Sequence, residues 1–572
     1  MLELSENTKH AMNQQSRRSF LKTITSNAAI LAAAAGTSLP AIASSNRQMN
    51  NGAQFSARDK RVLNAKLIRQ RAMKAALDQE IPIHENNGEE LDYPYIASFT
   101  KGMVHNELGE VDLKCWKMFA KAIESGKYED FEKIPLSHRR LKNPLAGLCY
   151  ELEGADPTLY RMKPAPRIDA PENSAEMAEL YWEALCRDVP FREYENSQVI
   201  NDAAGDLSKF TDLKAPKNFA GLSASQIFRG NTIGDSIGPY VSQFLYLDIP
   251  VSIPFLDGQN PIWTLEQRTQ TVEAGRNYLC DYSSWLSSNN GDLPKEYPKY
   301  DPVKRYIRNG RDFANAVHQD FPWQFAIHAA YLLYNLKFPY DDGIPYSTSK
   351  YMEGFATFGY PHLMANIAEA SVRAARAVWF QKWWVHRRLT ESFGGRIHNH
   401  LRKAADYSMI NGEILNSTVL EKIFELNAKQ NGDGTYLLPQ VYPEGSGLHP
   451  AYASGHAAMI GAAVTILKAW FDEDIVMPPP VVPNEDGTEL EPYSREFMEL
   501  TVGGELDKLA SNIALARNWA GIHWRSDATQ GLELGERVAI QLLKEQMLTY
   551  CEPVRFRFRR FNGTQEIINS MK

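Results

Sequence analysis

The sequence predicts a mainly α-helical protein, organised as one or more large helical-bundle domains. Three observations support this fold class. Apolar residues recur every three to four positions over long segments, which is the period of an amphipathic helix. Runs in which apolar and polar residues alternate are few, and Pro-, Gly- and Asp-rich loops separate the helical segments. With 572 residues, 44% hydrophobic and 23% charged, the chain is long enough for one unusually large domain or for two to three.

The predicted helices follow one another with loops between them. Helical periodicity extends over residues 57–80, 113–125, 175–188, 265–287, 312–336, 360–388, 417–427, 456–471, 494–519 and 528–546. Loops are predicted at 82–95, 288–303, 338–347, 431–450 and 476–493. Aromatic residues are frequent on these helices, and we interpret them as core and interface packing. Examples are Trp379, Phe380, Trp383 and Trp384.

The N-terminal segment, residues 1–43, is predicted to be a twin-arginine signal peptide. A pair of arginines at 17–18 precedes an apolar stretch over 24–39, and small residues follow at 41–43. A paired arginine, a short apolar region and a small-residue cleavage pattern are typical of such signals. The alternatives are a mitochondrial-type presequence or a disordered basic tail. We expect export by the twin-arginine route, which carries folded proteins, to the periplasm or outside the cell.

Charge and cysteine content exclude several classes of protein. The formal net charge is −7, and it becomes −9 without residues 1–43, which hold four basic and two acidic side chains. An acidic chain without a basic run argues against nucleic acid as a partner. No long apolar stretch follows the N-terminus, which excludes an integral membrane protein. The five cysteines form no C-x-x-C pair, so neither a zinc site nor a disulfide framework is indicated. An exported protein could still form one or two disulfide bonds, and the sequence does not say between which cysteines.

Three segments carry the residue types of a chemical site. Segment 381–395 holds a cluster of cations, segment 448–458 leads into an apolar helix, and segment 516–527 is followed by 530–536. Taken singly, each has a structural explanation. Serine and glycine before a helix form an ordinary N-cap. Histidine and aspartate four residues apart pair on a helix face, and cations near a helix end offset its dipole.

Taken together, the segments predict a site for a tetrahedral or trigonal-bipyramidal oxyanion. Ser454 and Gly455 open a helix whose free N–H groups attract an anion, and the glycine lets the anion approach the backbone. Lys382 and Arg517 can add charge-assisted hydrogen bonds to its oxygens. The expected anion is phosphate or vanadate.

Two histidines complete this predicted site. His456 and His523 suit a pair in which one attacks or coordinates the central atom and the other handles a proton. Asp527, four residues after His523, can accept a hydrogen bond from the second ring nitrogen and thereby select the tautomer.

The three segments resemble the motifs of the vanadium-dependent haloperoxidases, which share their anion site with the type 2 phosphatidic acid phosphatase superfamily. The family pattern is Lys…Arg-Pro, then Pro-Ser-Gly-His, then Arg…Gly-x-His-x-x-x-Asp. The resemblance points to the algal and cyanobacterial bromoperoxidase branch, and it extends through segments 94–102, 228–245 and 354–359. It implies the helical fold of that family. The chain would then comprise an N-terminal helical region at 44–310 and a helical-bundle catalytic region with the vanadate site at 311–572.

The resemblance assigns a role to each matching residue. His523 would bind vanadium directly, His456 would exchange protons at the apical oxygen, and Lys382 would polarise the peroxide. His449 would be the extra histidine of the bromoperoxidase branch, and Asp527 would support His523. The full set expected to bind the cofactor is Lys382, Arg388, Ser454, Gly455, His456, Arg517 and His523.

The chain departs from the family pattern at two positions. Ala453 replaces the proline before Ser454, which should change only the rigidity of the turn. Thr390 stands eight residues after Lys382, where the bromoperoxidase branch has an arginine, so Arg388 is the nearest replacement. A lost charge-assisted hydrogen bond costs about 1.5–3 kcal/mol, which corresponds to vanadate binding weaker by about 10- to 100-fold.

The implied activity is oxidation of bromide, and also iodide, by hydrogen peroxide to hypohalous acid, which halogenates organic acceptors. One alternative is phosphoester hydrolysis on the same site, with His523 as the nucleophile. Another is a weakly active or non-catalytic homologue, because of Thr390. The resemblance also implies a homo-oligomer. Loop 338–343, with two adjacent aspartates, is a candidate site for structural calcium, although such pairs also occur in ordinary turns.

Overall fold

The structure is a computed structural model that describes residues 57–216, 221–251, 263–495 and 497–569. The predicted signal peptide lies outside the described residues. The chain divides into two units, with the boundary between Lys74 and Ala75. All the site residues predicted above belong to the second unit. In the described part of the chain the five cysteines are free thiols, and no helix there has the length and apolar character needed to cross a membrane.

The described residues are mainly helical, as predicted. The α-helices are α2 (Ala57–Leu77), α3 (Glu89–Asp92), α4 (Leu113–Ser125), α5 (Tyr128–Phe131), α6 (Pro171–Cys186), α7 (Gln198–Leu207), α8 (Tyr282–Asn289), α9 (Gly310–Ala316), α10 (Gln324–Asn335), α11 (Tyr360–Phe380), α12 (Ser392–Arg402), α13 (Gly412–Leu415), α14 (Val419–Asn431), α15 (Gly455–Trp470), α16 (Val502–Trp519) and α17 (Arg525–Met547). Short 3-10 helices are η1 (Pro144–Leu148), η2 (Pro157–Leu159), η3 (Phe191–Asn196), η4 (Ile233–Ser236) and η5 (Gln243–Leu245), and η6 (Gln381–His386) is a π-helix.

The strands form small two-stranded antiparallel sheets at the periphery of the helices. They are β1 (Ile249–Pro250) with β2 (Thr264–Leu265), β3 (Thr269–Val272) with β4 (Tyr300–Arg305), β5 (Val481–Pro483) with β6 (Leu490–Pro492), and β7 (Arg555–Arg559) with β8 (Gln565–Asn569).

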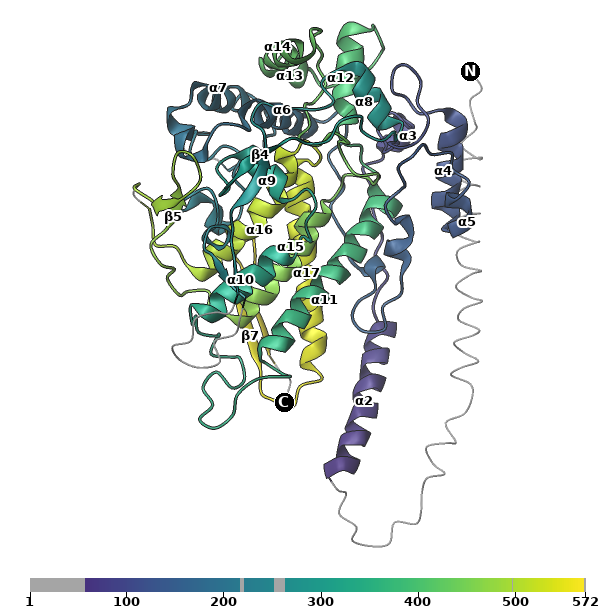
Figure 1. The fold of residues 1–572 in the computed structure, drawn as a ribbon. Coiled ribbons are helices and arrows are strands. Elements are labelled where there is room, and N and C mark those ends of the chain that lie inside the picture. The colour runs from purple at the N-terminus through teal and green to yellow at the C-terminus, as the bar shows by residue number, and fades with distance from the viewer. Residues whose placement is uncertain (1–56, 217–220, 252–262, 496, 570–572) are drawn as a thin grey trace. The chain divides into compact units, whose positions relative to one another are not determined.

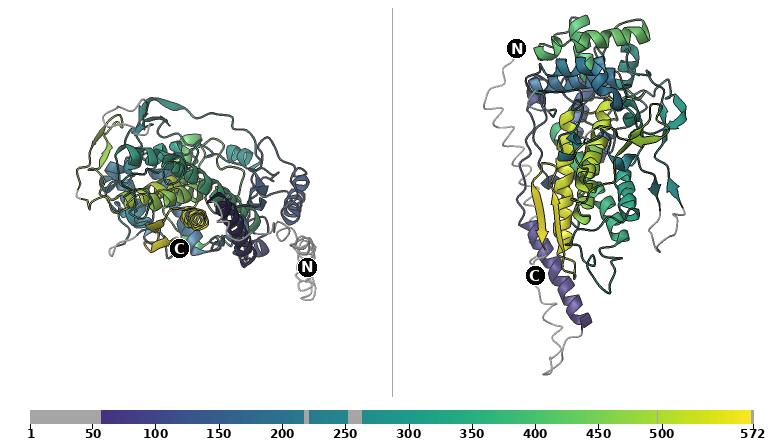
Figure 2. Two further views of the ribbon diagram at one scale, coloured as in Figure 1. Left: turned by 90° about the horizontal axis from the view of Figure 1, so that it is seen from below. Right: turned by 90° about the vertical axis from the view of Figure 1, so that its left-hand side faces the viewer.

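Four long helices, α11, α15, α16 and α17, form the bundle that carries the site (Figure 1). Helix α15 is apolar on nearly all sides and is buried along almost its whole length between the other three. Glycines on α17 allow it to lie close to α15. A Cβ at Gly531 would lie 2.6 Å from the Cβ of Ala457, and one at Gly535 would lie 2.0 Å from the Ala458 carbonyl oxygen. This close packing brings the first turns of α15 and α17 together, and two further views show the helices of the C-terminal part, coloured light green to yellow, running side by side (Figure 2).

One hydrophobic core runs through both predicted regions, 44–310 and 311–572. Its buried members range from Ala97 to Ile568. Helix α6 comes from the first region, yet it is buried along most of its length, since it packs against α14 and α16 of the second. The two predicted regions therefore share a core, and the boundary at residue 310 stays a prediction.

Three segments differ from the predicted helices. In segment 265–287, Leu265 ends β2 and residues 269–272 form β3, which pairs with β4, so only α8 at the end of the segment is helical. Segment 312–336 is split into α9 and α10, because Pro322 disfavours helix at the preceding residue and lacks an N–H. Segment 494–519 becomes helical only after Thr501, whose side chain accepts from the Gly504 N–H at 3.2 Å and caps α16.

Candidate functional site

The three predicted segments meet at one place inside the helical bundle. Lys382 lies in η6, the π-helical continuation of α11. Ser454 is the N-cap of α15, Arg517 lies in the last turn of α16, and His523 lies two residues before the start of α17. The backbone N–H of Ser454 donates to the carbonyl oxygen of Asp527 at 3.0 Å, which joins the first turns of α15 and α17.

Lys382 is a fully buried cation in a π-helical turn, a feature that is frequent at functional sites. Its Nζ donates to the carbonyl oxygens of Pro450 at 2.6 Å and Ala451 at 2.8 Å. It also lies 5.7 Å from the centre of the Trp379 ring. Two of the three ammonium N–H groups are thus engaged, which leaves one for an anion. Burial lowers the pKa of Lys382 to about 7, although the Asp527 carboxylate partly offsets this.

His523 is oriented by a carboxylate on the first turn of α17. Its Nδ1–H donates to Asp527 Oδ2 at 2.8 Å, and the two side chains are 3% and 0% exposed. The backbone N–H of Trp524 donates to the same oxygen at 3.2 Å. Burial and the cations Lys382 and Arg517 lower the pKa of His523 well below its usual value, so the ring is neutral. Because Nδ1 carries the proton, Nε2 presents its lone pair and can bind a metal.

His456, on the first turn of α15, is paired with a carboxylate that the sequence analysis missed. Its Nε2 lies 2.9 Å from Asp320 Oδ1, and the two side chains are 16% and 3% exposed. Burial and Arg517 lower the pKa of His456, while Asp320 works in the opposite direction. His456 is therefore a neutral, partly accessible base beside a carboxylate. Asp320 was missed because it lies in the break between α9 and α10, within a segment predicted to be one continuous helix.

Arg517 is the second cation of the cluster. Its Nη1 donates to the Val317 carbonyl and lies 3.4 Å from Tyr442 Oη. Its Nε is buried and has no hydrogen-bond partner among the described residues. A Cβ at Gly455 would lie 2.9 Å from Trp379 Cζ3, so the start of α15 has room only for glycine. Two buried cations, a helix N-terminus and a neutral histidine fit a tetraoxo anion such as vanadate.

His449, the predicted extra histidine, lies beside His523. The two rings are nearly parallel, with centres 6.2 Å apart. On its other side His449 contacts the Trp379 ring at 5.4 Å between centres, and its Nδ1 lies 3.0 Å from the Pro450 carbonyl oxygen.

Arg388 lies behind His523 and not with Lys382 and Arg517. Its Nη1 donates to Asp527 Oδ1 at 3.1 Å, and its Nη2 donates to Glu176 Oε2 at 2.8 Å. Its guanidinium therefore contacts the carboxylate that orients His523, whereas the sequence analysis expected it to hold the anion.

Thr390 occupies the position at which the resemblance expects an arginine. It is buried, and its Oγ1 lies 3.0 Å from Ser446 Oγ. The next residue, Glu391, forms a buried ion pair with Lys101. Arg387 is paired with a carboxylate from outside the site. Arg387 and Arg388 are thus both engaged with carboxylates. Neither of them takes the place of the arginine that the resemblance expects at position 390.

Loop 338–343, the candidate calcium site, has its carboxylates paired with arginines. Asp341 Oδ2 accepts from Arg557 Nη2 at 3.1 Å, and Asp342 pairs with Arg555. In the part of the chain that the structure describes, no group of three or more His, Cys, Asp or Glu side chains could hold a metal ion. Calcium at this loop stays a prediction, and the ion pairs do not favour it.

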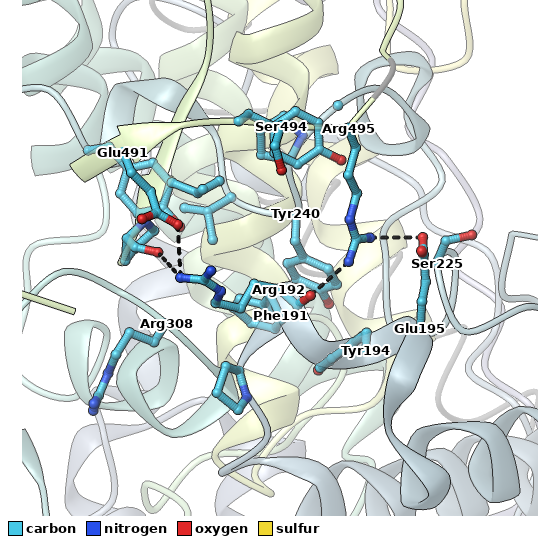
Figure 3. Close-up of a pocket in the computed structure, with 18 of the residues that line it drawn as sticks. Phe191, Arg192, Tyr194, Glu195, Ser225, Tyr240, Arg308, Glu491, Ser494 and Arg495 are labelled. Atoms are coloured by element: carbon cyan, nitrogen blue, oxygen red, sulfur yellow. Dashed lines mark hydrogen bonds and ion pairs between the residues drawn. The ribbon is translucent and has the colours of Figure 1, made fainter. Parts of the chain in front are cut away.

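A cavity of about 600 Å³ lies apart from the anion site, beside η3 and the β5–β6 hairpin (Figure 3). Four of its charged side chains form two ion pairs. Arg192 Nη1 lies 2.9 Å from Glu491 Oε1, and Arg495 Nη1 lies 2.8 Å from Glu195 Oε1. None of the predicted site residues lines this cavity.

Comparison with known proteins is consistent with this geometry. Residues 430–550 match a family model described as the VCPO second helical-bundle domain. A vanadium-dependent bromoperoxidase of Ascophyllum nodosum is 33% identical over 498 residues, covering 84% of this chain and 87% of that protein. One of Corallina officinalis is 32% identical over 596 aligned positions, covering 91% and 99%. Among solved structures, the homohexameric second vanadate-dependent bromoperoxidase of Ascophyllum nodosum has a TM-score of 0.83 and 28% identity, covering 91% and 92%.

Proposed function

Because the chain belongs to the family of vanadium-dependent bromoperoxidases, we propose that it binds vanadate and oxidises bromide with hydrogen peroxide. The product is hypobromous acid, which halogenates organic acceptors, and iodide is expected to react in the same way. One observation carries the proposal: two buried cations and the start of α15 gather around His523, whose ring Asp527 holds in the metal-binding tautomer.

The residues fit a vanadate group in both charge and geometry. The residues proposed to hold its oxygens are Lys382, Arg517, Ser454 and the backbone N–H of Gly455. Nε2 of His523 is proposed to bind the metal, since Nδ1 is engaged with Asp527. When bound, vanadate supplies a Lewis acid that activates peroxide toward halide without a change in oxidation state.

The protein's own residues control the protons of this reaction. With Nε2 of His456 held by Asp320, Nδ1 of the same ring is available to accept a proton from hydrogen peroxide. The remaining ammonium N–H of Lys382 would donate to an oxygen of the anion held beside it and would withdraw charge from that oxygen. The low exposure of His523 and Lys382 excludes bulk water from this side of the site.

The test uses the chain without residues 1–43, stripped of bound anion. Peroxide-dependent bromide oxidation is measured with and without added orthovanadate, and phosphate-ester hydrolysis is measured in parallel. We expect bromide oxidation only with vanadate. Phosphate-ester turnover that vanadate inhibits would instead identify a phosphatase. If the protein is folded but shows neither activity and binds no vanadate above the solvent control, the site is degenerate.

We also propose that the protein is a homo-oligomer. Support comes from its similarity to the homohexameric bromoperoxidase of Ascophyllum nodosum over most of both chains. Light scattering coupled to size-exclusion chromatography should give a mass several times that of one chain. A mass equal to a single chain at micromolar concentration contradicts the proposal.

Export by the twin-arginine route to the periplasm or outside the cell is proposed from residues 1–43 alone. The support is the pair Arg17 and Arg18 ahead of an apolar stretch. In a bacterial host, the full chain is expected in the periplasmic fraction, while the double variant Arg17→Lys, Arg18→Lys stays in the cytoplasm. Equal distribution of the two proteins contradicts the proposal.

A further inference from the structure

Arg388 connects the histidine of the anion site to a helix far upstream in the sequence. Its Nη1 donates to Asp527 Oδ1 at 3.1 Å and to Ser526 Oγ at 2.8 Å. Its Nη2 donates to Glu176 Oε2 at 2.8 Å and to Asn173 Oδ1 at 2.9 Å, both on α6. The guanidinium also lies 4.4 Å above the Trp524 ring, and the side chain is 2% exposed.

Glu176 holds the first turn of α17 through a second set of contacts. Its carboxylate accepts from the backbone N–H of Ser526 and, at 3.0 Å, from Ser526 Oγ. The first N–H groups of a helix have no partner within the helix, so a carboxylate from another element satisfies one of them here. Glu176 and Arg388 together fix the turn that carries Asp527.

We propose that Arg388 is a positioning residue for His523, acting through Asp527. This inference rests on the proposed function. One oxygen of Asp527 accepts from His523 Nδ1 and the other accepts from Arg388, so the carboxylate has a single orientation. With that orientation fixed, Nε2 of His523 is held toward the anion. Outer partners of this kind orient a metal-binding histidine and raise its basicity.

The same geometry argues against Arg388 as an oxyanion clamp. Its two terminal nitrogens are already engaged with the carboxylates of Asp527 and Glu176 and with two further side chains. A guanidinium held between two buried carboxylates could not reach an anion on the far side of His523 without depriving both carboxylates of their arginine counter-charge. Positioning is therefore the role that its contacts support.

The chain supplies a matched control between the same two helices. Arg525, the first residue of α17, pairs with Glu179 of α6 through its Nε at 2.8 Å and Nη2 at 2.6 Å. This pair is as buried as that of Arg388 with Glu176. No hydrogen bond or ion pair joins Arg525 to Asp527 among the described residues.

The experiment compares Arg388→Lys and Glu176→Gln with Arg525→Lys and Glu179→Gln, all in the full chain after removal of bound anion. Vanadate affinity is measured by equilibrium dialysis with elemental analysis of vanadium, and thermal stability is measured without anion. We expect the first two variants to bind vanadate about 10- to 100-fold more weakly. The control variants should bind within about twofold of wild type, although all four lower Tm by similar amounts.

Two outcomes overturn the inference. Vanadate affinity that is unchanged in Arg388→Lys and Glu176→Gln shows that the contacts are merely structural. Equal weakening in the control variants shows a general loosening of the α6–α17 contact. If Arg388→Lys does not fold, the vanadate affinity of Glu176→Gln decides whether the inference holds, because that variant keeps Arg388. Failure of the wild-type chain to bind vanadate contradicts the proposed function itself and is thereby distinguished from failure of this inference.

Discussion

The two histidines of the site are each paired with a carboxylate, but the pairs are built differently. His523 and Asp527 are 3% and 0% exposed, and the pair continues inward to Arg388. His456 is 16% exposed, and one oxygen of its partner Asp320 has no hydrogen-bond partner among the described residues. The first pair is a closed chain of contacts, whereas the second ends in an unpaired oxygen next to a partly accessible ring.

This difference suits two different tasks. A metal ligand must keep one orientation and one tautomer, which a carboxylate anchored by an arginine enforces. A proton carrier must change its protonation during each turnover, and a less constrained, more accessible ring tolerates that change. The following substitutions test this assignment of tasks, from the largest expected effect to the smallest.

His523→Ala removes the proposed metal ligand. We expect no stoichiometric vanadium by elemental analysis and no vanadate-dependent bromide oxidation, because the variant lacks the Nε2 lone pair that Asp527 orients. Circular dichroism and Tm establish that the variant is folded. Full vanadium content in a folded variant would contradict the assignment.

His456→Ala removes the proposed proton carrier and leaves the ligand in place. Bromide oxidation is expected to fall about 10²- to 10⁴-fold, as for loss of a general base. Vanadate binding should persist, because Lys382, Arg517 and His523 are untouched. If binding and activity are lost in the same proportion, the two histidines do not have separate tasks.

Asp320→Asn keeps a hydrogen-bond acceptor for His456 but removes its charge. We expect activity to fall about 10-fold, which is the smallest effect typical of losing a residue that hydrogen-bonds to a functional histidine from behind. The Asp320 carboxylate raises the pKa of His456, so its removal lowers that pKa further. The acid limb of the pH–rate profile should therefore move to lower pH. An unchanged acid limb would mean that the pKa of His456 does not determine the position of that limb.

His328 extends the comparison to a histidine without a carboxylate partner. Burial lowers its pKa to about 4, and its Nδ1 has no hydrogen-bond partner among the described residues. In the unfolded chain the ring binds a proton below about pH 6.5, whereas in the folded protein it stays neutral down to about pH 4. It therefore contributes stability above pH 6.5 that is lost as the pH falls toward 4.

His328→Phe should reduce the fall in Tm between pH 6.5 and 4.5 relative to wild type. Phenylalanine suits the position, since His328 packs edge-on against Phe325. The two proteins are compared by thermal melts in buffers of equal ionic strength, with Tm at pH 8 as the reference. Parallel Tm curves would show that other groups govern the acid sensitivity.

Sequence patterns predicted the helical fold and most of the residues that meet at the anion site. Motif spacing was sufficient for Ser454, His523 and Asp527, because each lies in the first turn of a helix or directly before one. Asp320 could not be found in this way. Its segment looked like one helix, and only the break before α10 brings its carboxylate to His456.

The role of Arg388 also could not be predicted from the sequence. Its position six residues after Lys382 suggested a second cation for the anion. The structure pairs it with Glu176, a residue more than two hundred positions upstream. A partner so distant in sequence carries no local signal, since it depends on how α6 packs into the shared core.

The shared core has a consequence for biosynthesis. His523, the proposed metal ligand, lies more than three hundred residues after α6, whose Glu176 supports it through Arg388 and Asp527. A ribosome must synthesise the chain from α6 through α17 before the proposed vanadate site can form, so cofactor loading would follow the synthesis of α17. For the same reason, segment 430–550, which matches the family model, is not a portable catalytic module. A shortened gene product that ended before α17 would remain without its cofactor, however much of the bundle it retained.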